Sequence, residues 1–177
     1  AGISLHSFRQ AVGYVTQESV MYSGTIRQNL LYGLDRTPDD RELDRVCEAV
    51  GILDFVQEQP EGYDTPVGEA GASLSGGQRQ RFSVARALLQ KSDILLLDEA
   101  TAAMDIAGKD CVWKSIRTLM AGKTVVYVAH DAQTLQNADW ILVLEHGTVT
   151  AAGLRQTVLQ QSAFCREMMD LKGGASA

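Results

Sequence analysis

Two short apolar runs place the strongest constraint on how this chain folds. Residues Ile94–Leu97 are apolar without interruption, and residues 124–129, with the sequence TVVYVA, are rich in β-branched side chains. Strands of this kind are buried on both faces, as in parallel sheets whose two sides are covered by helices. The segments 77–89 and 106–120 carry apolar residues at helical spacing. The order of these patterns therefore predicts an α/β fold built on a parallel sheet.

The remaining segments continue the alternation of strand and helix patterns. Thr37 or Asp39 is a suitable cap for a helix at 38–56, and turn residues break the pattern at 60–71. We expect the chain to be frayed from Gly173 onward. Further predicted elements are a strand at 12–15, helices at 25–31 and 132–137, paired strands at 140–144 and 148–151, and a helix at 154–171.

The bulk composition excludes several classes of protein. With 177 residues, 45% of them hydrophobic, the chain is long enough for one globular unit that can contain subdomains. A formal charge of −6 argues against the broad basic surface of a nucleic-acid-binding protein. No apolar run approaches the roughly 20 residues that span a bilayer, so we expect no direct membrane span. The three cysteines are widely spaced and odd in number, which indicates neither a disulfide framework nor a zinc site. The first residue is not Met and no signal-peptide pattern follows it, so we expect the printed start not to be the natural one.

Polar residues follow three of the predicted strands. Gln17 comes just after the first strand, Asp98 and Glu99 directly after the second, and His130 directly after the third. Ligands of open α/β sheets bind outside the carboxyl ends of the strands. We therefore expect these four side chains to line one crevice.

The acidic pair suits the hydrolysis of a phosphate ester or anhydride. Asp98 after a buried strand can hold Mg²⁺ through water, and Glu99 can polarise an attacking water molecule. The pair taken alone has a second interpretation, in which it simply ends a strand in solvent.

A second cluster precedes the helix at 77–89. Ser75, Gly76, Gly77 and Gln78 offer backbone N–H groups, a hydroxyl and an amide at the positive end of a helix dipole, which suits a phosphate. The same residues are also compatible with a plain helix cap and turn. His130, taken alone, is equally compatible with a structural histidine at a strand end.

Five sequence motifs, in one order, resemble those of the ABC ATPases, and the likeness covers nearly the whole chain. The stretches around Gln17 and before residue 74 resemble those of exporters, in which the ATPase domain is fused to transmembrane helices. The motifs are the Q-loop segment VGYVTQ at 12–17, the signature motif LSGGQRQRFSVARALL at 74–89, the Walker B motif ILLLDEAT at 94–101, the D-loop TAAMD ending at Asp105, and the switch-histidine segment VAH ending at His130.

The resemblance implies a role for each candidate residue in the bound nucleotide's own protomer. It implies that ATP and Mg²⁺ are bound, with Asp98 supporting the metal and Glu99 acting as general base. Gln17 would contact Mg²⁺ and the attacking water while reporting nucleotide state to the membrane domain. His130 would bind the γ-phosphate.

The resemblance also implies a head-to-tail dimer. Ser75, Gly76, Gly77 and Gln78 would bind the γ-phosphate of ATP held by a second nucleotide-binding domain, and Asp105 would assist across the dimer. The transmembrane domain of the transporter is the other implied partner. The expected location is the cytoplasmic face of a membrane.

The implied fold is a partial P-loop NTPase (RecA-like) core with an α-helical subdomain that carries the signature motif. Residues 1–177 would form one partial ATPase domain, with 1–17 and 89–177 in the core and about 18–88 in the Q-loop and helical subdomain. Losing the strand and helix of the P-loop would expose apolar faces of the sheet, so we expect this fragment to be marginally stable or to aggregate alone.

The sequence departs from the family pattern in three places. It contains no Gly-x-x-x-x-Gly-Lys-Ser/Thr: residues 122–124 end like one, but position 117 is Arg and the segment leads into a strand, which indicates a turn. Asp131 follows the histidine where exporters usually have Arg, which places a negative charge near a phosphate site. Residues 102–104, Ala-Ala-Met, replace the commoner Ser-Ala-Leu.

Three functional interpretations remain at this point. We favour the ATP-binding and ATP-hydrolysing domain of an exporter. The alternative is a non-catalytic fragment or degenerate partner that contributes only its signature surface to ATP bound by another subunit; the presence of Glu99 and His130 argues against degeneration. A DNA-associated ABC ATPase is disfavoured, because the chain between Gln17 and Ser75 is too short for a long coiled-coil insertion.

Overall fold

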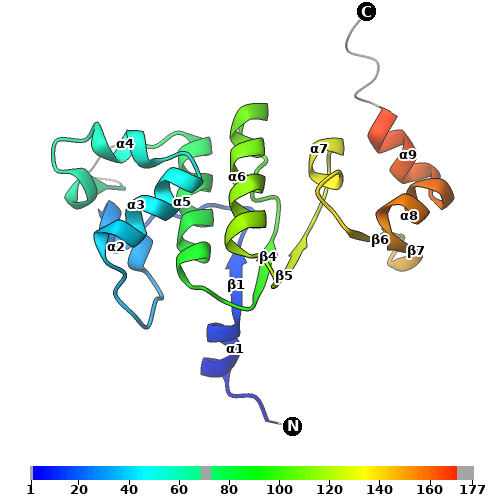
Figure 1. The fold of residues 1–177 in the computed structure, drawn as a ribbon, viewed down its shortest axis with the longest axis horizontal. Helices are drawn as coiled ribbons and strands as arrows, with labels where there is room; N and C mark the ends of the chain where they lie inside the picture. The colour runs from blue at the N-terminus through cyan, green and yellow to red at the C-terminus, as the bar shows by residue number, and fades with distance from the viewer. Residues whose placement is uncertain (1, 69–72, 171–177) are drawn as a thin grey trace, which may run out of the picture. The chain divides into compact units, whose positions relative to one another are not determined.

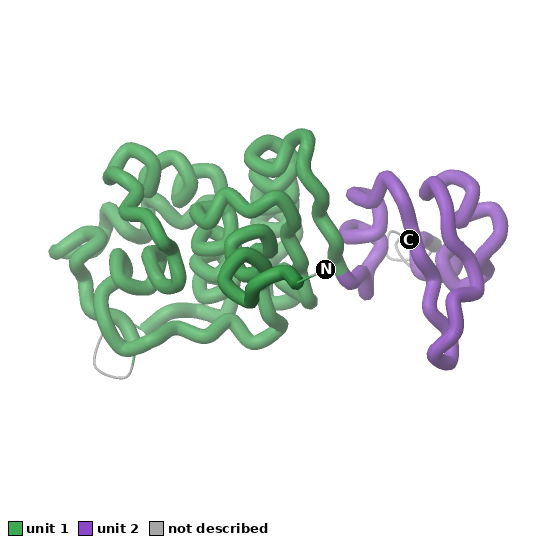
Figure 2. Tube along the Cα trace, turned by 90° about the horizontal axis from the view of Figure 1, so that it is seen from below, with its two compact units in different colours: residues 1–127 green, residues 128–177 purple. Residues whose placement is uncertain are grey.

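The computed structural model describes residues 2–68 and 73–170, and these form two compact units. The first unit comprises residues 1–127 and the second residues 128–177 (Figure 2). The predicted helix end at Leu171, the chain end from Gly173 and part of the predicted turn at 60–71 lie outside the described residues. Within the described ranges, no helix combines the length and apolar character needed to cross a bilayer.

A three-stranded parallel sheet forms the centre of the first unit (Figure 1). Its order is β1 (Val12–Val15), β4 (Ile94–Leu97) and β5 (Thr124–Tyr127), with Val15 opposite Leu97 and Leu97 opposite Tyr127. The predicted parallel sheet is thus confirmed, but the prediction of a strand through residue 129 was wrong. Strand β5 ends at Tyr127 because its partner β4 ends opposite it, at Leu97.

Two long helices pack beside this sheet and against each other, as Figure 1 shows. These are α5 (Gly76–Leu89) and α6 (Ile106–Leu119), each close to the predicted bounds. Phe82 on α5, Val112 on α6 and Leu95 on β4 are almost completely buried in one apolar core. The apolar spacing seen in the sequence therefore marks the faces that the helices bury.

Short elements fill the region between β1 and α5. Asp39 caps α3 by accepting a hydrogen bond from the Glu42 backbone N–H at 2.8 Å, so it is the cap rather than Thr37. The prediction of one helix over 38–56 was wrong, because Gly51 adopts a φ of +72° that ends the helix. These elements are α1 (Leu5–Ala11), which was not predicted, β2 (Gly24–Thr25), α2 (Ile26–Leu31), α3 (Asp40–Ala49), α4 (Leu53–Gln57), the 3-10 turn η1 (Gly62–Asp64) and β3 (Pro66–Val67), which pairs with β2.

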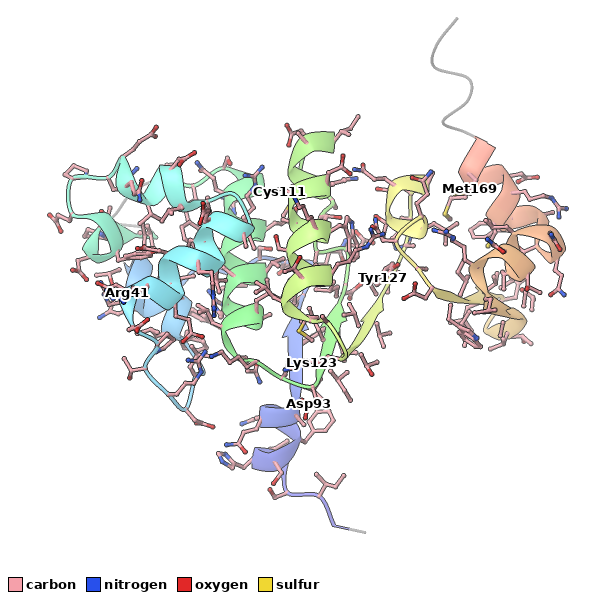
Figure 3. The ribbon with its side chains drawn as sticks, in the orientation of Figure 1. Arg41, Asp93, Cys111, Lys123, Tyr127 and Met169 are labelled. Carbon is pink, nitrogen blue, oxygen red and sulfur yellow. The ribbon has the colours of Figure 1, made fainter. Side chains whose placement is uncertain are left out.

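The turn before β5 lies at the amino end of the sheet. Gly122 has a φ of +77°, and the ammonium of Lys123 donates to the backbone carbonyls of Lys91 and Ser92 at 2.6 and 2.7 Å. Figure 3 shows Lys123 close to Asp93, with 3.8 Å between the ammonium and the carboxylate. The segment is therefore the turn that the sequence predicted, and its lysine is engaged in holding two strand starts together.

The second unit is a hairpin with helices. The predicted paired strands are present, but β7 extends to Leu154, and the predicted helix at 154–171 is broken at Ser162. Its hydroxyl oxygen accepts a hydrogen bond from the Cys165 backbone N–H at 3.2 Å and so caps a new helix. Val158 is completely buried in the small core of this unit. The elements are α7 (Ala132–Leu135), β6 (Trp140–Glu145), β7 (Thr148–Leu154), α8 (Arg155–Gln161) and α9 (Ala163–Asp170).

A buried ion cluster joins α3 to the end of α5. Arg36 donates to both carboxylate oxygens of Glu42 at 2.7 and 2.8 Å, and the Lys91 ammonium lies 2.8 Å from the same carboxylate. Hydrogen bonding from Arg36 lowers the pKa of Glu42 to about 2, with a further contribution from Lys91. Only 15% of the Glu42 side chain is exposed, so solvent screens this cluster weakly.

Acid should therefore weaken this cluster over a defined range. The folded pKa of Glu42 lies below the ordinary value of 4.5, so its stabilising contribution is complete above pH 4.5 and is lost as the pH falls towards 2. We expect Glu42→Gln to lower the free energy of unfolding by about 1–3 kcal/mol at neutral pH. Denaturant unfolding followed by tryptophan fluorescence should show this difference shrinking between pH 4.5 and 2. Glu48→Gln, at an exposed position of the same helix, is the control and should change little.

Candidate functional site

The candidate site begins where β1 and β4 end side by side. The parallel ladder continues one residue further, because the Asp98 backbone N–H donates to the Val15 carbonyl at 2.9 Å. Just past this point the side-chain amide of Gln17 donates to a carboxylate oxygen of Glu99 at 2.8 Å. The sheet register thus brings together two residues that are far apart in the sequence, as the expected crevice required.

Glu99 is held in an unusual backbone conformation. Its φ is +48°, in the left-handed region that costs a residue with a side chain about 1–2 kcal/mol. Its carbonyl accepts hydrogen bonds from the Ala102 backbone N–H at 3.1 Å and from the Gln80 side-chain amide at 3.4 Å. Strained residues of this kind persist where the surroundings hold them, often at functional sites.

The oxygen groups at this edge suit Mg²⁺. Asp98 and Glu99 are half-buried neighbours, and Gln17 uses its amide nitrogen on Glu99, which leaves its carbonyl oxygen for another partner. In the parts of the chain that the structure describes, no group of three or more His, Cys, Asp or Glu residues could hold a metal by itself. This fits Mg²⁺, which typically takes one or two carboxylates from the protein and the rest of its ligands from phosphates and water.

The signature residues form a reciprocal cap at the start of α5. The Ser75 hydroxyl oxygen accepts from the Gln78 backbone N–H at 3.2 Å, and the Gln78 side-chain oxygen accepts from the Ser75 backbone N–H at 2.8 Å. The cap uses only acceptor atoms of these two side chains. The Ser75 hydroxyl proton and the Gln78 amide protons therefore remain as donors, together with the first helical N–H groups of Gly76 and Gly77.

The D-loop lies directly against the two signature glycines. A Cβ built on Gly76 would lie 3.3 Å from the Ala103 Cβ, and one built on Gly77 would lie 3.3 Å from the Ala103 carbonyl oxygen. These separations are tight for real Cβ atoms. Glycine at both positions thus allows the D-loop to approach the start of α5.

Asp105 has a structural position at the end of the D-loop. Its carboxylate caps α6 by accepting from the Gly108 backbone N–H at 2.9 Å, and it lies 3.9 Å from the Arg81 guanidinium. Its side chain is nevertheless 76% exposed. Its proposed assistance across a dimer stays a prediction.

The segment after Gln17 is fixed to α2 and α5. The buried Asn29 side chain pairs with the backbone N–H and carbonyl of Tyr22 at 2.8 and 2.9 Å, and Arg86 donates to the Asn29 carbonyl at 2.8 Å. The guanidinium of Arg86 also lies over the rings of Tyr22 and Tyr32, which stack 4.2 Å apart. Burial lowers the pKa of Arg86.

Sequence reasoning missed Asn29, Gln80 and Arg86. The signal for Gln80 was its place one turn before the buried Val84, on the same face of α5, where an amide is unexpected. A polar residue in register with an apolar face indicates a buried hydrogen-bonding partner, but its identity requires the structure.

His130 belongs to the second unit, residues 128–177, and its role toward a phosphate stays a prediction. The neighbouring departure from the family pattern has a local explanation. Asp131 caps α7, accepting from the Thr134 backbone N–H at 2.6 Å. A carboxylate is a strong cap for a helix start, where an arginine could not accept this bond.

Comparison with known proteins decides the family. A family model described as "ABC transporter" matches residues 2–102, more than half of the chain. The chain belongs to the ABC transporter family. The family predicted from the five motifs is therefore confirmed.

Relatives of this ABC transporter domain are transport proteins. It is 43% identical over 156 residues to ABC transporter BEA3 of Gibberella fujikuroi, covering 88% of this chain and 12% of that protein. It is 41% identical over 157 residues to the ATP-dependent lipid A-core flippase of Syntrophus aciditrophicus, covering 89% of this chain and 26% of that one. The chain thus spans well under two thirds of the length of these relatives.

A solved structure confirms the predicted fold class. The chain is similar to a bacterial Atm1-family ABC exporter with ATP bound, with a TM-score of 0.87 and 36% identity. The match covers 96% of this chain and 30% of the exporter chain. The α/β architecture with a parallel sheet is therefore that of an ABC exporter's nucleotide-binding part.

The left-handed backbone at Glu99 can be tested by comparing glycine with alanine. Glycine accepts a φ of +48° without steric cost, so we expect Glu99→Gly to be more stable than Glu99→Ala by on the order of 0.5–1 kcal/mol, after allowing for its greater entropy when unfolded. Position 98 is the matched control. Asp98 has no positive φ, so there alanine should be the more stable substitution. Equal rankings at both positions in denaturant unfolding would contradict the strained turn.

Proposed function

We propose that this chain is the ATP-binding and ATP-hydrolysing part of an ABC exporter, which powers movement of a substrate across a membrane. The observation that carries the proposal is the hydrogen bond between Gln17 and Glu99 at the carboxyl edge of the sheet. It joins the Q-loop to the proposed general base in the position where nucleotide ligands of α/β sheets bind. The similarity to an ATP-bound exporter supports it.

The proposed reaction is in-line attack of water on the γ-phosphate of ATP. A bond forms between the water oxygen and phosphorus while the bond to the ADP oxygen breaks, and Glu99 accepts the proton of the water. Gln17, bonded to Glu99, orients the same water. Asp98 supports Mg²⁺, which would neutralise developing charge on the phosphates. His130 is the proposed contact to the γ-phosphate.

The signature residues are proposed to serve a second copy of the site. Ser75, Gly76, Gly77 and Gln78 place outward donors at the positive end of a fourteen-residue helix. These donors would bind the γ-phosphate of ATP held by a second nucleotide-binding domain in a head-to-tail dimer, with Asp105 assisting. Hydrolysis would then require two such domains.

A transmembrane domain is the other proposed partner. Tyr22 and Tyr32 form an exposed aromatic pair that is anchored by Arg86 and lies in the segment following Gln17. Aromatic side chains with a fixed orientation are common anchors of protein interfaces. This pair is therefore a suitable contact through which nucleotide state could reach the membrane domain. The proposed location is the cytoplasmic face of the membrane.

A non-catalytic role is less consistent with the site. A partner that contributed only its signature surface would have no use for the strained, doubly bonded conformation of Glu99. The sequence contains no Gly-x-x-x-x-Gly-Lys-Ser/Thr, so we expect the chain alone to be inactive. The proposed division into a core at 1–17 and 89–177 and a helical subdomain at about 18–88 stays a prediction.

Replacing the proposed general base tests the function. In the natural polypeptide that contains this chain, Glu99→Gln should lower kcat for ATP hydrolysis by about 10²–10⁴-fold while leaving ATP binding intact. The glutamine keeps the size of the side chain but cannot accept the proton. Glu58→Gln, at an exposed position beyond α4, is the control and should hydrolyse ATP normally. Normal turnover by Glu99→Gln would refute the catalytic role.

A further inference from the structure

Gln80 is a buried amide that the proposed reaction leaves without a role. It lies in the second turn of α5 and is only 5% exposed. Its amide nitrogen donates to the Glu99 carbonyl at 3.4 Å, and its amide oxygen accepts from the Ala103 backbone N–H at 2.8 Å. The orientation of the amide is fixed by these partners, because a carbonyl can only accept and a backbone N–H can only donate.

One end of this bridge is the turn that carries the proposed general base. The carbonyl of Glu99 is bonded to Gln80, and its carboxylate is bonded to Gln17 at 2.8 Å. The left-handed φ of +48° means that the backbone relaxes elsewhere unless its surroundings hold it. Gln80 is the side chain that holds the main chain of this turn.

The other end of the bridge is the start of the signature helix. Ala103, whose N–H is bonded to Gln80, is in close approach to both Gly76 and Gly77. A ligand that shifts these glycines must also move Ala103. A continuous set of packed and hydrogen-bonded atoms thus runs from the signature residues through Ala103 and Gln80 to Glu99.

We propose that Gln80 is a positioning residue through which nucleotide contact at the signature motif sets the backbone of Glu99 in the same protomer. This proposal rests on the proposed function. In a head-to-tail dimer the signature motif of one protomer contacts the ATP of its partner, whereas Glu99 acts on the ATP of its own protomer. Gln80 would therefore couple the two ATP sites of the dimer.

The coupling has a physical basis in the two bonds of one amide. Both bonds are short enough to form together only when the turn at 99–103 keeps its present shape. Arg81, the next residue, donates to the Gly51 carbonyl and lies near Asp105, so it braces α5 against other segments and not against Glu99. The contact to Glu99 is specific to Gln80 among the side-chain bonds described for α5.

Gln80→Met is the main test variant, because it keeps the length of the side chain and removes both hydrogen bonds. In the natural full-length polypeptide, we expect kcat for ATP to fall about 10- to 100-fold, as for a misplaced catalytic group. KM for ATP and the affinity for the nonhydrolysable analogue AMP-PNP with Mg²⁺ should stay within about twofold, because no atom of Gln80 contacts the proposed ligand donors. The Ala103 amide should also exchange faster with deuterium.

Two further variants keep the test decisive. Ser83→Ala, at another buried polar position of α5, is the control for disturbance of the helix and should leave kcat unchanged. Gln80→Glu keeps an acceptor for Ala103 but presents no donor to the Glu99 carbonyl, so it should lose turnover even though one bond remains. It also provides the measurement if Gln80→Met fails to fold.

The outcomes separate this proposal from the proposed function. If Gln80→Met or Gln80→Glu turns over within twofold of the unaltered protein, or if kcat and AMP-PNP affinity fall together, the positioning role is wrong. In either case a loss of hydrolysis in Glu99→Gln would still support the ATPase. If Glu99→Gln hydrolyses ATP normally, the proposed function itself fails.

Discussion

The parallel pairing of β1 with β4 is the constraint on which the rest of the site depends. Because Val15 lies opposite Leu97, the residues that follow both strands emerge at the same edge. The bond between Gln17 and Glu99 is a direct result of this register. A slip by one residue would turn the side chains of β1 to the opposite faces and would separate the two groups.

Around this edge, the turn from Glu99 to Asp105 is held from several sides. Gln17 bonds the first carboxylate, Gln80 bonds the main chain at two points, and the signature glycines lie against Ala103. Each contact is local and modest in energy. Together they allow a glutamate to occupy a backbone conformation that it would otherwise avoid.

The sequence predicted the parts of this arrangement that depend on periodicity and motif. The parallel sheet, the two long helices and the meeting of Gln17 with Glu99 followed from apolar runs and from where polar residues end them. The single helix at 38–56 failed because the sequence pattern does not show that Gly51 adopts a positive φ. Short elements such as α1 and β2 were missed because they have too few residues to establish a period. Gln80 was missed because its partners are main-chain groups, which leave no mark on sequence spacing.

The anchoring of Tyr22 has a mechanical consequence. Gln17 is tied to the sheet through Glu99, while Tyr22 is tied through Asn29 and Arg86 to α2 and α5. The few residues between them form a short strap joined to a different body at each end. Any rotation of the helical region against the sheet must be taken up within this strap or must pull Gln17 away from the carboxylate. The length of the strap therefore limits how far the helices can turn before the catalytic geometry is lost.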